Sequence, residues 1–173
     1  MPVNMEFKAR VADLGPSRKW LRDQQARFVG MDEQVDVYFH VPKGRLKLRM
    51  GQIERALIYY KRAEQDAIRR SDVWLYPVQD AEALKQLLQA SLGILGEVSK
   101  KREIYFIDAT KFHLDEVKGL GYFIEVEVID ASPAAHVDRL EALAAHYQQA
   151  LHIRPDQLIR ASYLDMLLAA NGK

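Results

Sequence analysis

Cysteine is absent from the 173 residues of the chain. Its absence excludes disulfide bonds and zinc sites built from thiolates. No apolar run approaches the roughly 20 residues that a membrane-spanning helix needs. The N-terminus also lacks the apolar core of a secretory signal. We therefore expect a cytoplasmic protein with no membrane partner.

An excess of charge of one sign is also missing, because 25 Lys and Arg residues balance 24 Asp and Glu residues to a formal net charge of +1. Such a chain has no general electrostatic reason to bind nucleic acid, and we expect none as a partner. Any anion site must come from a local arrangement of charges. The content of 49% apolar and 28% charged residues is typical of a globular protein, and the length suits one domain.

Short segments of alternating or β-branched residues, separated by turn residues, predict about eight strands. We expect them at residues 3–12, 35–41, 45–50, 56–63, 73–78, 97–107, 111–118 and 122–129. Helices are expected at residues 17–28, 80–92 and 162–170, and from residue 132 along an apolar stripe, Leu140 to Leu151. The pattern favours an α+β protein: an eight-stranded antiparallel β-barrel with helices inserted and appended.

Charged side chains recur at alternate positions of these strands. In NMEFKAR, Glu6, Lys8 and Arg10 share one face, because side chains alternate with period two. The same spacing places other charged residues in phase within later strands: Arg45, Lys47 and Arg49; Lys100 and Arg102; Glu125 and Glu127. For a single strand, the simplest interpretation is a face in contact with solvent.

Taken together, the charged rows favour an interior. Arg and Lys residues segregate onto some strands and Glu residues onto another, whereas exposed faces usually mix polar residue types. If the sheet closes, one face of every strand points inward. Many enclosed cations must be neutralised, which a polyanion can do. Carboxylates beside phosphates are typical ligands of Mg²⁺ or Mn²⁺. The sequence therefore predicts a metal-bound phosphate chain inside a barrel.

The same segments resemble the CYTH superfamily, the triphosphate tunnel metalloenzymes. NMEFKAR is similar to the ExExK signature, and later blocks follow in the family's order: DVYFHVPKGRLKLR, LIYYKR, VSKKREIYF, LDEVKGLGYFIEVEV and SYLDMLL. The resemblance extends from about Asn4 to Leu168. It implies one domain over residues 1–173, with an eight-stranded triphosphate tunnel at about 3–131 and C-terminal helices at about 133–170.

The resemblance also implies roles for individual residues. The positions that match phosphate-binding cations are Lys8, Lys47, Arg49, Lys61, Lys100 and Arg102. The positions that match acidic residues near the metal are Glu6, Asp115, Glu125 and Glu127. The first Glu of the signature is replaced by Asn4, whose amide oxygen can ligate a hard cation without adding charge. Lys100 is also a candidate general base, for which it would need a strongly lowered pKa.

Three functions remain open. The blocks DVYF…GRLKLR and GLGYFIEVEV are most similar to the class IV adenylyl cyclase branch, which implies conversion of ATP into cyclic AMP and pyrophosphate. A triphosphatase would instead hydrolyse tripolyphosphate, thiamine triphosphate or a nucleoside triphosphate. A non-catalytic sensor of triphosphates or polyphosphate is the third reading, supported by Asn4.

The five histidines show no metal-ligand spacing and are interpreted as incidental. The stripe from Leu140 to Leu151 is expected to pack on the barrel, with a homodimer contact as the alternative.

Overall fold

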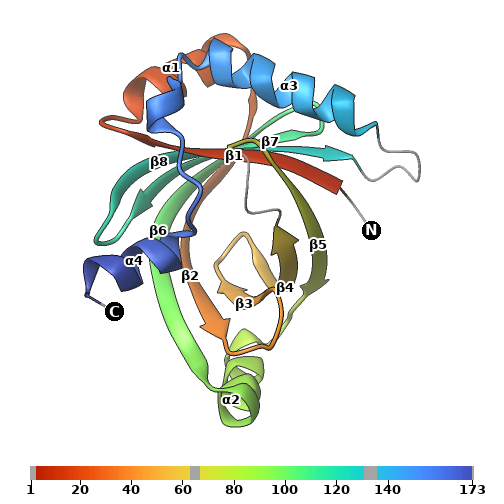
Figure 1. The fold of residues 1–173 in the computed structure, drawn as a ribbon, viewed down its shortest axis with the longest axis vertical. Helices are drawn as coiled ribbons and strands as arrows, with labels where there is room; N and C mark the ends of the chain where they lie inside the picture. Colours follow the sequence, from red (N-terminus) through yellow and green to blue (C-terminus); the bar gives the residue numbers. More distant parts are fainter. Residues whose placement is uncertain (1–2, 63–66, 131–135, 173) are drawn as a thin grey trace.

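The computed structural model describes residues 3–62, 67–130 and 136–172. Its strands are β1 (Val3–Val11), β2 (Arg27–Phe39), β3 (Arg45–Met50), β4 (Arg55–Arg62), β5 (Arg69–Pro77), β6 (Ile94–Ile107), β7 (Thr110–Val117) and β8 (Gly121–Asp130). All pairings are antiparallel, and the strands close into a barrel in the order β1-β5-β4-β3-β2-β6-β7-β8 (Figure 1). The predicted eight-stranded α+β barrel is therefore confirmed.

The helices are inserted between strands or follow them. They are α1 (Gly15–Asp23), α2 (Ala81–Leu92), α3 (Val137–Ala150) and α4 (Tyr163–Ala170), with a short 3-10 turn at Pro155–Gln157. None of the helices in the described part of the chain is long and apolar enough to cross a membrane. The first residues of the predicted C-terminal helical segment, 132–135, lie outside the described residues. The same holds for residue 63 of the predicted fourth strand.

The predicted helix over residues 17–28 is wrong in its second half. Helix α1 ends at Asp23, and Gln25 turns the chain with a φ of 56°. Strand β2 then begins at Arg27 and pairs with β6 along its whole length. Phe28 packs against Tyr105 of β6, with ring centroids 4.9 Å apart. Pairing between distant strands therefore overrides the helical spacing of the local sequence.

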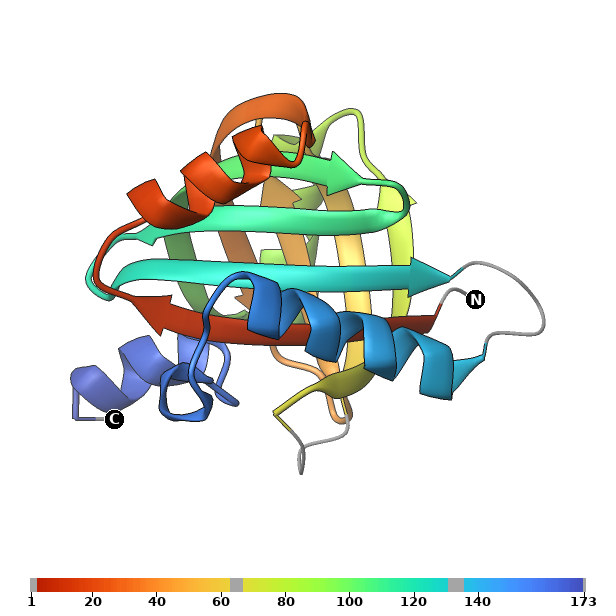
Figure 2. The same ribbon diagram turned by 90° about the horizontal axis from the view of Figure 1, so that it is seen from above.

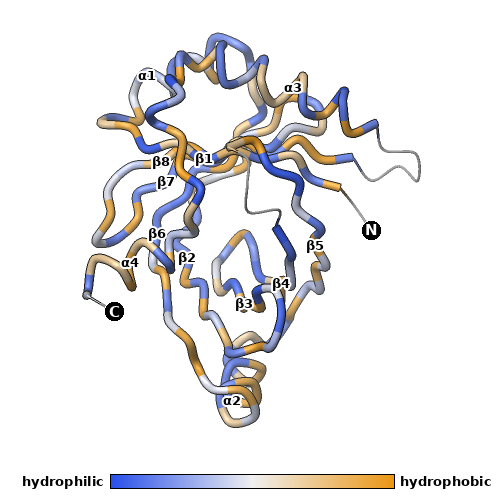
Figure 3. Tube along the Cα trace, in the orientation of Figure 1, coloured by the Kyte–Doolittle hydropathy of each residue, from blue (hydrophilic) through white to orange (hydrophobic). Residues whose placement is uncertain are grey.

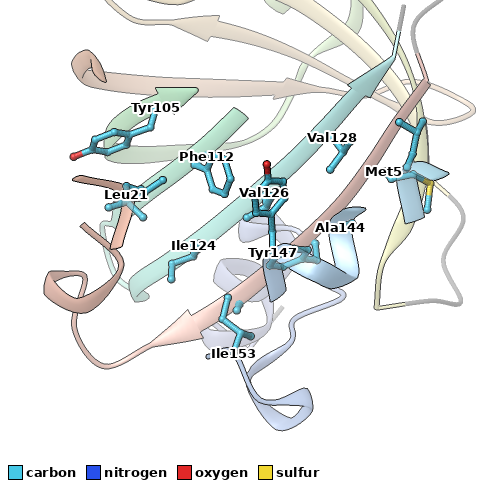
Figure 4. Close-up of a cluster of buried hydrophobic side chains, with 14 of the residues drawn as sticks. Met5, Leu21, Tyr105, Phe112, Ile124, Val126, Val128, Ala144, Tyr147 and Ile153 are labelled. Carbon is cyan, nitrogen blue, oxygen red and sulfur yellow. The ribbon is translucent and has the colours of Figure 1, made fainter. Parts of the chain in front are cut away.

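Helices α1 and α3 cover the outside of β1, β7 and β8 (Figure 2). Phe7 of β1 and Leu140 of α3 belong to this cluster. Figure 4 shows three more of its members, Phe112 of β7 with Ala144 and Tyr147 of the α3 stripe. The Phe112 and Tyr147 rings meet edge to face at 5.0 Å. The stripe therefore packs on the barrel, as expected.

This outer packing fixes which face of each strand points inward. Met5, Phe7 and Ala9 of β1 lie in the cluster beneath the helices. Because side chains alternate, the intervening side chains of β1 point into the barrel. Hydrophilic and hydrophobic residues alternate along the strands in Figure 3. Helix α2 packs against Val37 and Leu48 in the same way, at the other side of the ring.

Candidate functional site inside the barrel

The inward positions carry buried polar side chains on most strands. Those with little exposure include Asn4, Glu6, Lys8, Asp32, Gln34, Asp36, Lys47, Arg49, Arg69, Ser71, Lys100, Arg102, His113, Asp115 and Glu125. A cavity of about 460 Å³ lies among the strands, and both cations and carboxylates line it. The structure thus places nearly all the predicted site residues in the interior.

One side of the interior, here called the basic wall, consists of Lys47, Arg49 and Lys100. All three surround the carboxylate of Asp36 on β2. Arg49 donates to it from Nε and Nη2 at 2.9 and 3.0 Å, and the lysine Nζ atoms of Lys47 and Lys100 donate at 3.1 and 2.8 Å. Burial alone would raise the pKa of Asp36, but Arg49, Lys100 and Lys47 hold it well below its usual range.

Lys100 is the most perturbed cation of this wall. Its side chain is 1% exposed. Burial lowers its pKa to about 7 despite the adjacent Asp36, and Arg102 and Arg49 lower it further. The proton on Lys100 is therefore weakly held near neutral pH, as a general base requires.

Arg102 and Asp115 form a buried pair next to Glu125, which lies 3.9 Å from Nη2 of Arg102. Arg102 donates from Nε and Nη2 to the two Asp115 oxygens, both at 2.7 Å, and the Tyr163 hydroxyl of α4 donates to Asp115 at 2.7 Å. Nη1 of Arg102 has no partner among the described residues. Asp115 therefore pairs with Arg102 and contacts α4. It is not one of the three side chains that lie close enough together to share a metal ion in the described chain.

The second side of the interior, here called the acidic corner, consists of His113, Glu125 and Glu127. Their potential ligand atoms lie within 4.8 Å of one another. Nδ1 of His113 is 3.4 Å from Oε1 of Glu125, and Lys8 Nζ is 3.8 Å from the other oxygen of Glu125. Glu6 pairs in register with Glu127 across the β1–β8 ladder.

Charge repulsion marks this corner. Burial raises the pKa of Glu127 to about 8, and the nearby carboxylates of Glu125 and Glu6 add to the rise. Burial also lowers the pKa of His113 to about 4, so its imidazole is neutral at pH 7. A neutral imidazole and two carboxylates are donors that suit a divalent cation. The residues present therefore fit the metal that the sequence predicts.

The turn between β3 and β4 adds a carboxylate that sequence reasoning missed. Glu54 reaches Arg49 at 3.4 Å and also pairs with Lys111. Asp32 holds this turn, because its carboxylate accepts from the backbone N–H groups of Gln52, Ile53 and Glu54 at 2.7, 3.0 and 2.9 Å. The signal in the sequence was weak, since a turn residue has no strand phase.

Lys61 is the predicted site residue that the structure places elsewhere. It is exposed, and its Nζ lies 6.0 Å from the centroid of the exposed Trp74 ring. The buried Tyr60 sets the phase of β4, so the next inward cation is Arg62, whose Nε is 2.9 Å from Glu6. The prediction that Lys61 faces the interior is wrong by one residue.

Two interior residues could have been found from alternation. Asp36 stands in phase with Gln34 and Tyr38 in QVDVY, and all three are buried. His113 stands in phase with Asp115 in HLD. The interpretation of His113 as incidental is therefore not supported by its position.

Fold and interior together define a class of protein: a closed antiparallel barrel that holds a group of cations opposite a group of carboxylates. The family model described as the CYTH domain matches residues 3–163. The chain therefore belongs to the CYTH domain family, as its sequence blocks predicted.

Similar proteins extend over nearly the whole chain. A protein of Methanocaldococcus jannaschii, provisionally named an adenylate cyclase, is 25% identical over 95% of this chain and 98% of its own length. The structure of a Pyrococcus horikoshii protein has a TM-score of 0.82 and 23% identity, covering 94% of this chain and 98% of that one. A Hippeastrum protein, provisionally an adenylyl cyclase and described with a dominant triphosphatase activity, has a TM-score of 0.64 and 13% identity, covering 100% and 97%. Both structures show that the fold is shared.

Proposed function

We propose that this protein is a metal-dependent enzyme acting on triphosphates, and that its favoured reaction converts ATP into cyclic AMP and pyrophosphate. The observation that carries the proposal is the placement of the basic wall and the acidic corner inside one barrel. A triphosphate carries negative charge along its length, and its divalent cation carries positive charge. A metal–triphosphate complex therefore complements both sides at once.

The cations would bind the phosphate oxygens. Lys47 and Arg49 already donate to one oxyanion, the Asp36 carboxylate, and phosphate oxygens would accept the same kind of hydrogen bond. Arg102 keeps a buried Nη1 without a partner in the described part of the chain, and Lys8 lies beside Glu125. Charge-assisted hydrogen bonds of this type are the strong ones in phosphate recognition.

The acidic side chains would hold Mg²⁺ or Mn²⁺. Glu125 and Glu127 supply carboxylate oxygens, and Glu6 lies opposite Glu127 on β1. When bound, such an ion neutralises phosphate charge and polarises the phosphorus under attack.

Lys100 is the candidate base of the cyclase reaction. The ribose 3′-oxygen forms a bond to the α-phosphorus, the bond from that phosphorus to pyrophosphate breaks, and the hydroxyl proton passes to Nζ. The lowered pKa of about 7 leaves a useful fraction of Lys100 neutral near pH 7.

Hydrolysis of a triphosphate is the second candidate. The charged groups of the interior recognise phosphates and metal, which a triphosphatase needs as much as a cyclase does. The Hippeastrum neighbour, described with a dominant triphosphatase activity, supports this reading. Binding without turnover, as in a sensor, is the third, because Asn4 leaves the acidic side one carboxylate short of the family signature.

Product analysis separates the three. ATP, GTP, thiamine triphosphate and tripolyphosphate are incubated with Mg²⁺ and with Mn²⁺, and a Glu125→Gln/Glu127→Gln double variant controls for contaminating enzymes. Cyclic AMP with pyrophosphate is the expected result. Release of inorganic phosphate would establish the triphosphatase, and calorimetric binding without products would establish the sensor. A protein that binds none of these substrates and forms no product from them would overturn the proposal.

A further inference from the structure

His113 is interpreted as incidental from its spacing, yet it lies beside the acidic side chains of the interior. It is a β7 residue that is 1% exposed, and it lines the same cavity as Glu125 and Glu127. One imidazole nitrogen and one oxygen from each carboxylate lie within 4.8 Å of one another. Three donors at this mutual spacing can share one ion.

Two buried polar atoms at this cavity also lack a hydrogen-bond partner within the residues the structure describes. They are Nε2 of His113 and Oδ1 of Asn4, the two that are not on β4. An unsatisfied buried polar atom costs on the order of 1–3 kcal/mol, so such atoms are rare unless a bound group completes them. Both atoms can accept a cation, one as a nitrogen donor and one as an oxygen donor.

The kind of donor decides which ion the corner prefers. Mg²⁺ takes oxygen ligands almost exclusively and keeps several of its waters. Imidazole nitrogen instead favours first-row transition ions, whose affinity for nitrogen sites exceeds that of the hard alkaline-earth ions.

From this geometry we infer that His113 is a metal ligand together with Glu125 and Glu127, and that the corner selects a first-row transition ion such as Mn²⁺ over Mg²⁺. The inference deepens the proposed function and rests on its metal site. It does not depend on which triphosphate reacts, or on whether any does.

The test uses the full chain with Mn²⁺ alone and no substrate. Electron spin echo measurements on bound Mn²⁺ detect nitrogen coupled to the ion, and labelling the histidines with ¹⁵N shifts that signal. The wild-type protein is expected to show one coupled imidazole nitrogen. This measurement needs no variant, so a folding defect cannot obscure it. Absence of nitrogen coupling in the metal-loaded protein would overturn the inference.

Calorimetry with the same preparations measures the preference. We expect Mn²⁺ to bind at least about ten-fold more tightly than Mg²⁺, and His113→Gln to lose that margin while Mg²⁺ binding changes by less than about three-fold. His146→Gln is the matched control, because His146 is exposed on α3. Equal affinity of the wild type for the two ions contradicts the inference. Nitrogen-coupled Mn²⁺ in a protein that turns over no triphosphate would uphold it and overturn the proposed reaction.

Discussion

The basic wall and the acidic corner balance their charges differently. On the wall, three cations surround the carboxylate of Asp36, and Arg49 also reaches Glu54. In the corner, Glu125 and Glu127 lie close together, and the pKa of Glu127 rises to about 8 because of burial and its acidic neighbours. Cations therefore outnumber carboxylates on the wall, whereas the corner crowds carboxylates together, so that Glu127 keeps its proton at neutral pH while Lys8 and Arg102 balance Glu125.

This separation shows what the interior is arranged to receive. Charges of one sign held together inside a protein are costly unless they gain a partner. A bound anion would reduce the repulsion among the cations of the wall, and a bound cation would reduce the repulsion among the carboxylates of the corner. Binding of both is therefore expected to stabilise the fold. Arg102 differs from the cations of the wall, because Asp115 takes its Nε and Nη2 while only Nη1 is left for a ligand.

Breaking the pair of Arg102 and Asp115 is expected to have the largest effect. Asp115→Asn leaves the guanidinium of Arg102 buried without its carboxylate, which costs about 3–5 kcal/mol of unfolding free energy. Urea denaturation followed by circular dichroism measures it. Tyr163→Phe, which removes only the hydroxyl bonded to Asp115, is expected to cost roughly 1.5–3 kcal/mol. Loss of Mn²⁺ affinity in Asp115→Asn at unchanged stability would restore the predicted role of Asp115 near the metal.

Removing one cation of the wall is expected to stabilise the protein at low pH. The pKa of Lys100 falls from 10.5 to about 7 on folding, chiefly through burial, so the unfolded chain binds this proton more tightly. The stabilising contribution of neutral Lys100 is present above pH 10.5 and is lost as the pH falls through about 7. Lys100→Met should therefore gain about 2–4 kcal/mol over wild type near pH 6 and little near pH 10.

Thermal and urea unfolding between those two pH values measure the difference. Lys101→Met is the matched control, because Lys101 follows directly on β6 and is exposed. It should show no such pH dependence. A constant difference between Lys100→Met and wild type at all pH values would show that Lys100 keeps its proton in the folded barrel, and would remove it as a base.

The wall and the outer face of β4 can be compared directly. Arg49→Ala is expected to weaken tripolyphosphate binding by roughly 1.5–3 kcal/mol, the usual worth of a hydrogen bond to a charged group. Lys61→Ala should leave the affinity unchanged, because Lys61 lies on the outside beside Trp74. Calorimetry measures both. An equal loss in the two variants would mean that the anion does not bind at the wall.

The side chains that the sequence placed correctly are those fixed by local alternation. Lys47 and Arg49 are separated by Leu48, and the buried apolar residue settles which face is which. Lys61 and Arg62 are adjacent cations, so alternation alone cannot choose between them. The choice depends on Tyr60 being inside, which is a property of the closed barrel.

The pairings could not be predicted from the sequence for a related reason. Asp36 and Lys100 are 64 positions apart and meet only because β2 pairs with β6 in one particular register. Glu54 enters from a turn that Asp32 holds in place. Such contacts depend on register and closure, which strand alternation does not encode.

The smallest expected effect tests the crowding of carboxylates in the corner. Asn4→Glu adds a carboxylate at the cavity where Oδ1 of Asn4 now has no partner in the described chain. The added charge should strengthen Mn²⁺ and Mg²⁺ binding by roughly 1 kcal/mol, as expected for one more charge near an ion in a partly solvated site. Calorimetry without substrate measures it.

Removing a carboxylate from the corner is the counterpart of adding one. Glu127→Gln removes a carboxylate from the corner and should weaken the binding of both ions, so the two variants bracket the wild type. Without metal, we expect the order of thermal stability to be the reverse of the order of metal affinity. Asn4→Glu adds a repelling charge beside Glu6 and Glu127. Glu127→Gln removes a buried ionisable group, whose pKa is raised to about 8. Metal-free Asn4→Glu should therefore unfold at a lower temperature than wild type, and Mn²⁺ should restore it. If added metal stabilises all three proteins equally, these carboxylates do not bind it.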